Sequence, residues 1–423
     1  MREMKDSGVV WLGNIPETWD LVQLGSLFSE HKNKNTEMQS NNLLSLSYGN
    51  IIRKDINTSD GLLPESFEGY NVIDDGDIIL RLTDLQNDQK SLRVGLSHEK
   101  GIVTSAYVTL RKRNPAMNSQ FFYYLIHSYD VRKGFYGMGA GVRQGLNFAG
   151  VRKIMLTLPS VDEQTAIAAF LGKKITQVDN LIANVQAQIE KLKAYKQSLI
   201  TEVVTKGLDP TVPMKDSGVE WIGEIPAHWE VTRIKNLFEL RNERNDEADL
   251  SKVNLISLYT DLGVVQHSDI VETTGNRAIT AEGYKFVYKN DIVVNIILCW
   301  MGAVGMSRYD GVTSPAYDIY RPLADTNSEY YHYLFRTNRF NGECYRYGRG
   351  IMMMRWRTYS TEFRAINIPC PPAKEQKQIV AYLKEKCTQI DQLIAIKQAK
   401  IEKLEQYKRS LIYEYVTGKK EVM

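Results

Sequence analysis

The chain has 423 residues, of which 43% are hydrophobic and 24% charged, and its formal net charge is +3. This composition is typical of globular proteins with more than one domain, and it excludes a disordered chain. The longest apolar run lies around residues 291–300 and is about half of the ~20 residues that a membrane helix needs. The charged N-terminus lacks the apolar segment of a secretory signal. The sequence therefore predicts a cytoplasmic protein that is not inserted in a membrane.

The four cysteines all lie in the second half of the chain and form no C-x-x-C pair. They indicate neither a disulfide framework nor a zinc site, and reduced thiols fit a cytosolic protein. A net charge of +3 is by itself weak support for a polyanionic partner, so only local clusters of basic residues can indicate one.

The same opening motif occurs twice in the chain. Residues 4–20 read MKDSGVVWLGNIPETWD and residues 214–230 read MKDSGVEWIGEIPAHWE, with 11 of 17 positions identical. Residues 163–205 match residues 375–417 at a constant offset of 212, with 26 of 43 positions identical. Repeats of solenoid proteins are only ~20–50 residues long, so each copy here is a domain-sized unit.

The region between these anchors predicts a mixed α/β domain in each copy. In the first copy, β-rich runs occupy residues 42–48, 77–82 and 106–112, and an amphipathic helix is expected at 119–130. In the second copy, the corresponding runs are 253–259, 291–298 and 317–322, followed by a helix at 328–337. Short strands followed by one such helix predict a helix packed on a sheet.

A polar and basic segment, RLTDLQNDQKSLR at residues 81–93, follows an expected strand of the first copy. Such side chains can bond to base edges and phosphates. The candidate DNA contacts in this segment are Arg81, Thr83, Gln86, Asn87 and Lys90. Its counterpart, CWMGAVGMSR at residues 299–308, is quite different and contributes Arg308 as a candidate. Different targets for the two units and drift after duplication would both produce this divergence.

A glycine-rich segment, GFYGMGAGVRQGLNFAGVRKI, follows the expected helix at residues 134–154. Arg143 suits guanine, Gln144 and Asn147 suit adenine, and the glycines let a loop approach a groove closely. A flexible surface loop with solvated arginines would have the same composition. A nucleotide-binding loop is disfavoured, because no strand precedes the glycines and no G-K-[ST] follows them.

The corresponding segment of the second copy, residues 342–366, is also rich in glycine, aromatic and basic residues. Its candidate DNA contacts are Arg349, Arg355, Trp356 and Arg357. Three arginines in one segment suit base reading and phosphate positioning equally.

Each copy ends in an expected long helix with a coiled-coil seam. The seam residues of the first helix are Ile175, Val178, Ile182, Val185, Ile189, Leu192, Lys196, Leu199 and Val203. Those of the second are Cys387, Ile390, Ile394, Lys397, Ile401, Leu404, Lys408, Leu411 and Tyr415. Each helix is expected to span roughly 28 residues, about 42 Å. The sequence KGLDPTVP at residues 206–213 ends the first helix with a glycine and two prolines.

We expect the two helices to form an intramolecular antiparallel pair, because an apolar stripe of this length needs a partner and the helices match in length. A parallel pair would crowd both globular domains at one end. It would also lose the twofold symmetry that suits a duplicated unit. A plain structural spacer and a docking surface for a partner both fit these helices.

No catalytic or metal-binding pattern is found in the sequence. The motifs H-E-x-x-H and G-x-S-x-G are absent, the six histidines are scattered, and no N-P-P-[FY] or D-P-P-[FY] loop of an adenine methyltransferase occurs. We therefore expect no catalytic residue, no metal ligand and no cofactor in this chain.

The chain resembles the specificity subunits of type I restriction-modification systems over nearly its whole length. The resemblance rests on W-x-G-x-I-P-x-x-W at Trp11 and Trp221, on LPSVDEQ and CPPAKEQ before the helices, and on IEKLKAYKQSLI and IEKLEQYKRSLI within them. It implies that two target-recognition domains each read half of a bipartite double-stranded DNA target. It also implies that the helical regions space these domains and bind two methyltransferase subunits.

The resemblance further implies a non-catalytic subunit. Partner subunits would methylate adenine at N6 with S-adenosylmethionine, and a motor nuclease would cut unmodified DNA with ATP and Mg. Together with the repeat, it gives a mixed α/β architecture with two pseudo-twofold-related recognition domains, separated by an antiparallel pair of long coiled-coil helices. The expected recognition domains are residues 1–159 and 208–371, and the helical regions are residues 160–207 and 372–423.

Other functions fit parts of the same sequence. A modification-only complex would use the same subunit without a nuclease, and neighbouring genes would separate these two possibilities. A coiled-coil protein-interaction scaffold would lack the steep salt dependence that phosphate contacts impose on DNA binding. An enzyme acting alone would transfer methyl groups without partner subunits.

Overall fold

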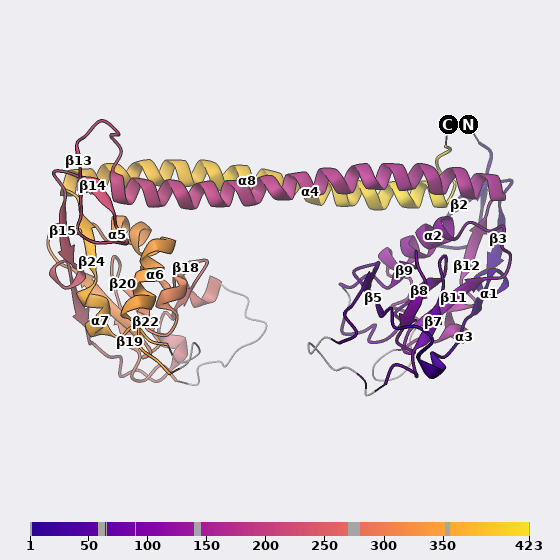
Figure 1. Cartoon of the computed structure of the whole chain (residues 1–423), viewed down its shortest axis with the longest axis horizontal. Helices are drawn as coiled ribbons and strands as arrows, with labels where there is room; N and C mark the ends of the chain where they lie inside the picture. The colour runs from indigo at the N-terminus through magenta and orange to yellow at the C-terminus, as the bar shows by residue number, and fades with distance from the viewer. Residues whose placement is uncertain are drawn as a thin grey trace. The chain divides into compact units, whose positions relative to one another are not determined.

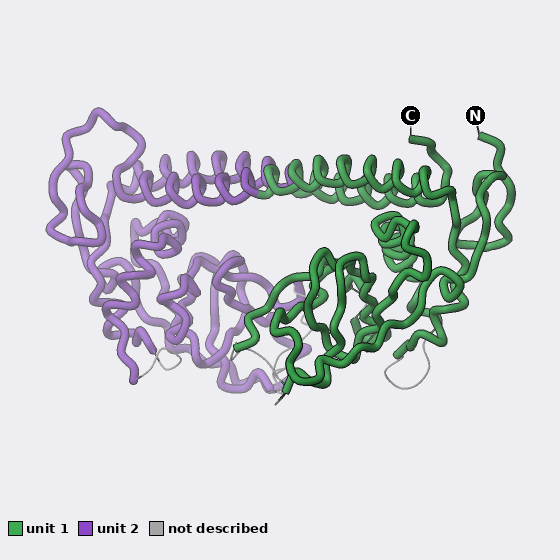
Figure 2. The backbone as a smooth tube through the Cα atoms, turned by 45° about the vertical axis from the view of Figure 1, so that its right-hand side comes forward, with its two compact units in different colours: residues 1–186, 398–423 green, residues 187–397 purple. Residues whose placement is uncertain are grey.

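The computed structural model of the chain describes residues 2–57, 64, 66–88, 90–138, 145–269, 280–351 and 356–422. The chain divides into two compact units, residues 1–186 with 398–423 (unit 1) and residues 187–397 (unit 2), as Figure 2 shows. Each unit contains one α/β domain and part of both long helices, α4 (Val161–Lys206) and α8 (Ala373–Val416) (Figure 1). Among the helices of the described residues, none combines the length and the apolar composition of a membrane span.

Unit 1 is built on an antiparallel four-stranded sheet with the strand order β4-β11-β8-β9. Further antiparallel pairs are β1-β2, β3-β12, β5-β6 and β7-β10. The strands are β1 Met4–Asp6, β2 Asn14–Pro16, β3 Asp20–Gln23, β4 Phe28–Glu30, β5 Leu44–Ser47, β6 Asn50–Arg53, β7 Asn71–Ile73, β8 Ile78–Leu80, β9 Val94–Leu96, β10 Gly101–Val103, β11 Val108–Lys112 and β12 Met155–Leu158. The helices are α1 Leu24–Leu27, η1 Thr36–Met38, α2 Ser119–Val131 and α3 Phe148–Val151.

Unit 2 repeats this plan with the sheet order β16-β23-β20-β21 and the pairs β13-β14, β15-β24, β17-β18 and β19-β22. The strands are β13 Met214–Asp216, β14 Glu224–Pro226, β15 Glu230–Arg233, β16 Phe238–Arg241, β17 Ile256–Tyr259, β18 Gly263–Gln266, β19 Lys285–Val287, β20 Ile292–Asn295, β21 Val304–Met306, β22 Gly311–Thr313, β23 Tyr317–Pro322 and β24 Asn367–Cys370. The helices are η2 Ile234–Asn236, η3 Leu250–Lys252, η4 His267–Asp269, η5 Cys299–Met301, α5 Ser328–Phe335, α6 Asn338–Tyr347 and α7 Ser360–Ala365.

The strands and the helix expected in each copy are confirmed. The runs 42–48, 77–82 and 106–112 contain β5, β8 and β11, and the helix expected at 119–130 is α2. The second copy gives β17, β20, β23 and α5 in the same order. Strands β8 and β20 are buried along their whole length, which explains why they read as unbroken apolar runs.

The core of each unit includes the ends of both long helices. In unit 1, Phe122 and Leu125 of α2 belong to the same buried cluster as Leu171 of α4 and Leu411 of α8. The equivalent cluster of unit 2 contains Val204 near the end of α4 and Leu383 near the start of α8. Each α/β domain is therefore fixed to the helix pair by a continuous core.

The repeated opening motif forms the place where one long helix begins and the other ends. In unit 1, buried Trp19 donates from Nε1 to Glu163 Oε1 of α4 at 3.1 Å. Gly418, just beyond α8, packs so closely against the Trp19 ring that an added Cβ would contact it. In unit 2, Trp229 donates to Glu375 Oε2 of α8 at 2.8 Å, and Gly207 closes α4 against its ring with φ +77°. Glycine is suited to such left-handed helix ends.

The two long helices are antiparallel, as expected. Asp179 of α4 pairs with Lys408 of α8 at 2.7 Å, and Lys196 of α4 pairs with Asp391 of α8 at 2.6 Å, so rising numbers in α4 meet falling numbers in α8. These two ion pairs are related by the repeat. They explain how polar Lys196 and Lys408 are accommodated in an otherwise apolar seam.

The expected helix length of roughly 28 residues is wrong, because α4 has 46 residues and α8 has 44. The coiled-coil pattern begins only at Ile175, since earlier apolar residues such as Ile167 pack into the domain core instead. A capping box starts α4: Ser160 Oγ accepts the Glu163 N–H, and Glu163 Oε2 accepts the Ser160 N–H, both at 3.2 Å. The S-x-x-E spacing at 160–163 was the sequence signal for this earlier start.

Candidate nucleic-acid interface

The first candidate segment of unit 1 is the loop that joins β8 to β9. Thr83, Gln86, Asn87 and Lys90 are exposed on this loop, and Arg81 is half-buried. Asn87 Nδ2 donates to Asp84 Oδ1 at 2.8 Å, which orients its amide. The loop therefore presents short polar side chains and one lysine to solvent, as a surface that contacts nucleic acid requires.

Asp88 is an acidic residue of this loop that lies close to Arg81. Hydrogen bonds from Ser91 lower the pKa of Asp88 to about 2, so its carboxylate is ionised at neutral pH. The Arg81 guanidinium lies 3.9 Å from it. The pair holds Arg81 near the loop and reduces the positive charge that Arg81 presents to a phosphate.

The second candidate segment of unit 1 lies beside this loop. Leu146 N–H donates to Leu82 O at 2.9 Å, and Gly145, Thr83, Asp84 and Asn87 line one surface hollow of about 470 Å³. The structure thus brings together residues of the two segments that are more than 50 positions apart in the sequence, such as Leu82 and Leu146. Arg143 and Gln144 lie outside the described residues.

Asn147 has a structural role that the sequence analysis did not include. It is the N-cap of α3, where its side-chain Oδ1 accepts the Gly150 N–H at 3.2 Å. Asparagine is among the residues that most favour this position. Since the oxygen is used in the cap, Asn147 can offer a base mainly its amide donors, which weakens the expected bidentate contact with adenine.

The two candidate segments of unit 2 also converge. Thr358 N–H donates at 2.8 Å to the carbonyl of Ile296, three residues before the first segment. Arg349 and Arg357 bond to each other through their backbones at 2.8 and 2.9 Å. The ring of Trp356 stacks on Tyr345 with centroids 4.9 Å apart, and Trp300 contacts the same tyrosine at 5.7 Å. Met301 beside it has half of its surface exposed. Aromatic rings next to arginines suit stacking and phosphate contacts.

Sequence reasoning missed Trp300 and Tyr345 in this cluster. Both lie in the candidate segments, and only the contacts of Trp300 and Trp356 with Tyr345 show that the three rings form one group. The aromatic residue in the run CWM at 299–301 was the available signal.

The arginines of unit 2 differ in their surroundings. Arg349 pairs with Glu362 at 2.6 Å, although three-quarters of its side chain is exposed. Arg308 pairs with Glu329 at the start of α5, at 3.4 Å. Strand β21 lies between the loop that contains Trp300 and Arg308, so Arg308 is not part of the aromatic cluster. Arg355 lies outside the described residues.

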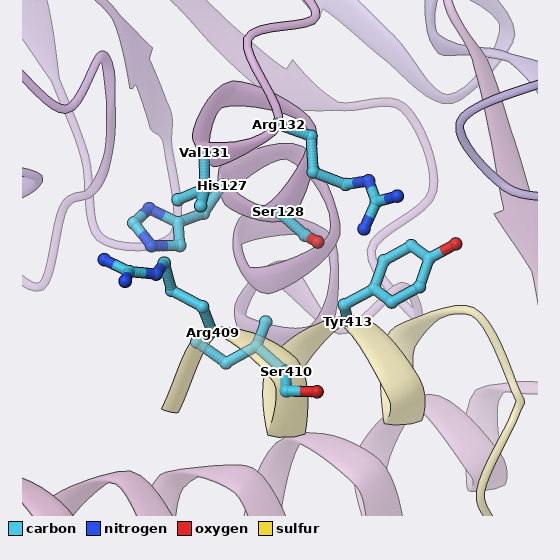
Figure 3. Close-up of a pocket in the computed structure, with 8 residues that line it drawn as sticks. His127, Ser128, Val131, Arg132, Arg409, Ser410 and Tyr413 are labelled. Carbon is cyan, nitrogen blue, oxygen red and sulfur yellow. The ribbon is translucent and has the colours of Figure 1, made fainter. Parts of the chain in front are cut away.

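A separate cavity of about 280 Å³ lies between α2 and α8 in unit 1 (Figure 3). His127 and Arg132 line it from the α2 side, and Arg409 and Tyr413 line it from α8. The Arg132 guanidinium lies 4.1 Å from the centre of the Tyr413 ring. Burial and nearby Lys408 lower the pKa of His127 to about 4, so its ring is neutral at pH 7. None of the residues proposed from the sequence lines this cavity.

Comparison with known proteins identifies the two repeated stretches. Residues 16–194 and 226–406 each match the family model described as type I restriction modification DNA specificity domain. The chain is 24% identical to the type I restriction enzyme MjaVIII specificity subunit of Methanocaldococcus jannaschii, over 96% of this chain and 93% of that protein. It is also 24% identical to the putative type I restriction enzyme MjaX specificity subunit of the same organism, covering 96% and 95%.

Solved structures show the same fold. A chain from a study titled as the structural basis of complex assembly and conformational transition of the type I R-M system matches with a TM-score of 0.69 at 15% identity, covering 95% of this chain and 98% of that one. The HsdS subunit from Thermoanaerobacter tengcongensis matches with a TM-score of 0.52 at 16% identity, covering 96% and 98%. The chain therefore belongs to the family of type I restriction-modification specificity subunits, with two target-recognition domains.

Proposed function

We propose that each unit reads one half of a bipartite double-stranded DNA target. The observation that carries this proposal is the convergence of two candidate segments in each unit, joined by the Leu146 to Leu82 bond in unit 1 and by the Trp300 to Tyr345 ring contact in unit 2. The two clusters differ in chemistry, since unit 1 offers amides and a lysine whereas unit 2 offers aromatic rings and arginines. Different clusters on a shared scaffold would read different half-sites.

In unit 1, we assign base reading to Gln86, Asn87 and the amide donors of Asn147, and phosphate contact to Lys90 and Arg81. Arg143 and Gln144 remain proposed readers of the same half-site. In unit 2, we assign stacking to Trp356 and base or phosphate contact to Arg349, Arg355 and Arg357, with Arg308 as an outlying phosphate contact. Thr83, which lines the hollow of unit 1, is also proposed as a DNA contact.

We also propose that the chain docks two methyltransferase subunits through its long helices. Leu181 of α4 and Tyr407 of α8 are 50% and 53% exposed in unit 1, and Leu393 and Tyr195 are 48% and 57% exposed in unit 2. All four residues directly precede a seam position, and the register set by Asp179 with Lys408 places each leucine level with a tyrosine. Two equal apolar patches fit two copies of one partner.

The flank of the seam that carries these patches is not the flank that meets the recognition domain. Asp179 and Glu405 directly follow seam positions, and they line a groove together with Tyr123 and His127 of α2. The leucines and tyrosines lie on the other side of the seam by the same register. A partner can therefore bind there without displacing α2.

The chemistry belongs to the partners in this proposal. This chain is the non-catalytic subunit with no cofactor of its own, the methyltransferase subunits use S-adenosylmethionine on adenine N6, and a motor nuclease subunit uses ATP and Mg. The proposed recognition domains are residues 1–159 and 208–371, and the helical regions 160–207 and 372–423 space them. The complex works in the cytoplasm.

The test is methylation by the complex reconstituted from this chain and the methyltransferase subunits encoded with it. Duplexes altered in one half-site at a time report each unit separately. Gln86→Ala and Gln144→Ala are expected to relax only the unit 1 half-site, and Arg357→Ala only the unit 2 half-site, by roughly 5- to 100-fold in discrimination. Gln39→Ala, another exposed glutamine of unit 1, is the matched control.

Two results would contradict the assignment. Unchanged discrimination in all three variants would mean that these segments do not read DNA. Binding that lacks a salt dependence would mean that the chain is not a DNA-contacting subunit at all, because phosphate contacts release counterions. An equal loss on every duplex for Arg357→Ala would assign Arg357 to phosphate positioning.

A further inference from the structure

Arg93 is a buried arginine at the end of the β8–β9 loop. Its side chain is 0% exposed, whereas arginines in proteins are almost never fully buried without partners. It directly precedes β9, and its backbone N–H donates to Asp130 Oδ2 of α2 at 2.6 Å. The side chain therefore starts from a fixed point in the core and extends back under the loop.

The guanidinium of Arg93 bonds to the backbone of the loop at several points. Nη1 donates to Thr83 O at 2.6 Å and reaches Arg81 O at 3.5 Å. Nη2 donates to Asp84 O at 3.3 Å and also to Asp88 O. A planar guanidinium has five N–H donors in a fixed arrangement, so it can bond to more carbonyls at once than the three-donor ammonium of a lysine.

Other contacts also hold the loop, since Leu82 O accepts the Leu146 N–H at 2.9 Å and Asp88 Oδ1 accepts the Lys90 and Ser91 N–H groups at 3.2 and 3.0 Å. Leu82 and Leu85 are its buried apolar side chains, and Asp84 adopts a left-handed backbone with φ +56°. Tyr136 adds a second layer, since Arg93 Nε donates to its Oη at 3.4 Å. The Arg93 side chain adds to these contacts by bonding to the carbonyls of four residues of the loop, Arg81, Thr83, Asp84 and Asp88.

We propose that Arg93 is a positioning residue for target reading: it fixes the backbone that carries Thr83, Gln86, Asn87 and Lys90, and so sets the half-site specificity of unit 1. This inference rests on the proposed function of the loop. A loop that is already ordered loses less conformational freedom on binding DNA, and its side chains meet only the matching base edges.

Unit 2 has no arginine at the position of Arg93, so it supplies an internal control. The strand registers Leu80 with Val94 and Val294 with Val304 place Ala303 at the position of Arg93. The loop of unit 2 is instead contacted by Arg336, the residue after α5, whose Nη1 donates to Gly302 O at 3.4 Å. A change at Arg93 should leave the unit 2 half-site unaffected.

The test compares Arg93→Lys and Arg93→Gln in the reconstituted methyltransferase complex. Two quantities are measured: amide hydrogen exchange of residues 81–93, and the ratio of methylation on duplexes that are matched or mismatched in each half-site. We expect faster exchange in the loop and about a tenfold loss of discrimination for the unit 1 half-site. Discrimination at the unit 2 half-site should not change. Arg93→Lys retains the positive charge but loses the planar guanidinium, so this variant should keep little more discrimination than Arg93→Gln.

Two further variants keep the test decisive. Arg113→Gln removes another arginine of unit 1 that donates to two carbonyls, Gly25 O and Phe28 O, and it should change neither quantity. Asp88→Ala loosens the loop from its surface, because Asp88 accepts the Lys90 and Ser91 N–H groups at 3.2 and 3.0 Å. It should reproduce the defect in part even if Arg93→Gln fails to fold.

The outcomes separate the inference from the proposed function. Unchanged exchange in Arg93→Lys would refute the role of Arg93 in fixing the loop. Faster exchange with full discrimination at both half-sites would refute the link between loop order and reading. A wild-type complex that methylates without regard to either half-site would refute the proposed function itself.

Discussion

At the scale of single residues, one glutamine at the same position of each copy, Gln164 in unit 1 and Gln376 in unit 2, connects a long helix to its domain. Gln164 Oε1 accepts the Asn118 N–H at 3.0 Å, and its Nε2 donates to Pro159 O at 2.9 Å. Gln376 makes the same two bonds with Asn327 and Pro371, at 3.1 and 2.8 Å. Asn118 and Asn327 are the N-caps of α2 and α5, so each glutamine joins the start of a long helix to the start of a domain helix.

Gln164→Leu should destabilise unit 1 by roughly 2 kcal/mol or more, because it leaves one buried N–H and one buried carbonyl without partners. Chemical denaturation and hydrogen exchange in α2 would measure the loss. Gln177→Leu, on the exposed face of the same helix, is the control. Equal stability of both variants would show that the buried bonds contribute little.

His332 makes the stability of unit 2 depend on pH. Its Nδ1 accepts the Met306 N–H at 3.2 Å, and burial, with Arg336 and Arg308 nearby, lowers its pKa to about 3. In the unfolded chain the pKa is about 6.5, so the unfolded state binds the proton first as pH falls. The stability that neutral His332 contributes is fully present above pH ~6.5. It falls by up to about 1.4 kcal/mol for each pH unit as the pH is lowered toward 3.

His332→Asn keeps an acceptor near the same place but cannot titrate. Thermal unfolding between pH 4 and 8 should therefore be less dependent on pH in this variant than in the wild type. Parallel pH profiles of the two proteins would exclude His332 as the source.

At the scale of elements, the helix pair has two flanks with different tasks. One flank meets α2 in unit 1, and the other presents the Leu181–Tyr407 and Leu393–Tyr195 patches. Burying a leucine and a tyrosine would contribute a few kcal/mol per patch at ~25 cal/mol per Å² of apolar surface. That contribution suits a partner contact spread over more residues than these four.

Leu181→Glu combined with Tyr407→Glu should remove one of two methyltransferase subunits, because each charge must be desolvated at the contact. Native mass spectrometry would then show one subunit per chain instead of two. Gln406→Glu adds one negative charge next to Tyr407, outside the proposed patch, and should leave the stoichiometry intact. Two bound subunits in the double variant would mean that the partner docks elsewhere.

At the scale of the whole molecule, we expect helix length to set the spacing between half-sites. Each α/β domain shares a core with the ends of both helices, so changes in the helices are transmitted to it. Deleting one aligned heptad from each helix, residues 182–188 with 394–400, shortens each helix by ~10 Å. The seam register is kept, with a turn of only ~20° relative to a straight helix.

The deletion variant should recognise the same half-sites with a spacer about three base pairs shorter, at ~3.4 Å per base pair. Methylation of a duplex series with graded spacers measures this. Binding of the methyltransferase subunits is checked first, because the deletion lies close to the proposed docking patches. If the deletion variant assembles, is active and keeps the original spacing, the partner subunits or the linker after Gly207 must set the spacing instead of helix length.

The sequence by itself determined the duplication, the α/β domains and the antiparallel helix pair. Period and offset are properties of the chain, and an apolar seam such as Val178 to Val203 can be satisfied only by a matching helix. Tertiary structure alone decided how the candidate segments combine and what supports them. Leu82 bonds to Leu146, Trp356 stacks on Tyr345, and Arg93 lies beneath its loop, all through contacts between residues whose local sequence carries no signal of the pairing. Local periodicity reports which face is buried, whereas a buried guanidinium such as that of Arg93 depends on partners that only the folded chain brings within hydrogen-bond distance.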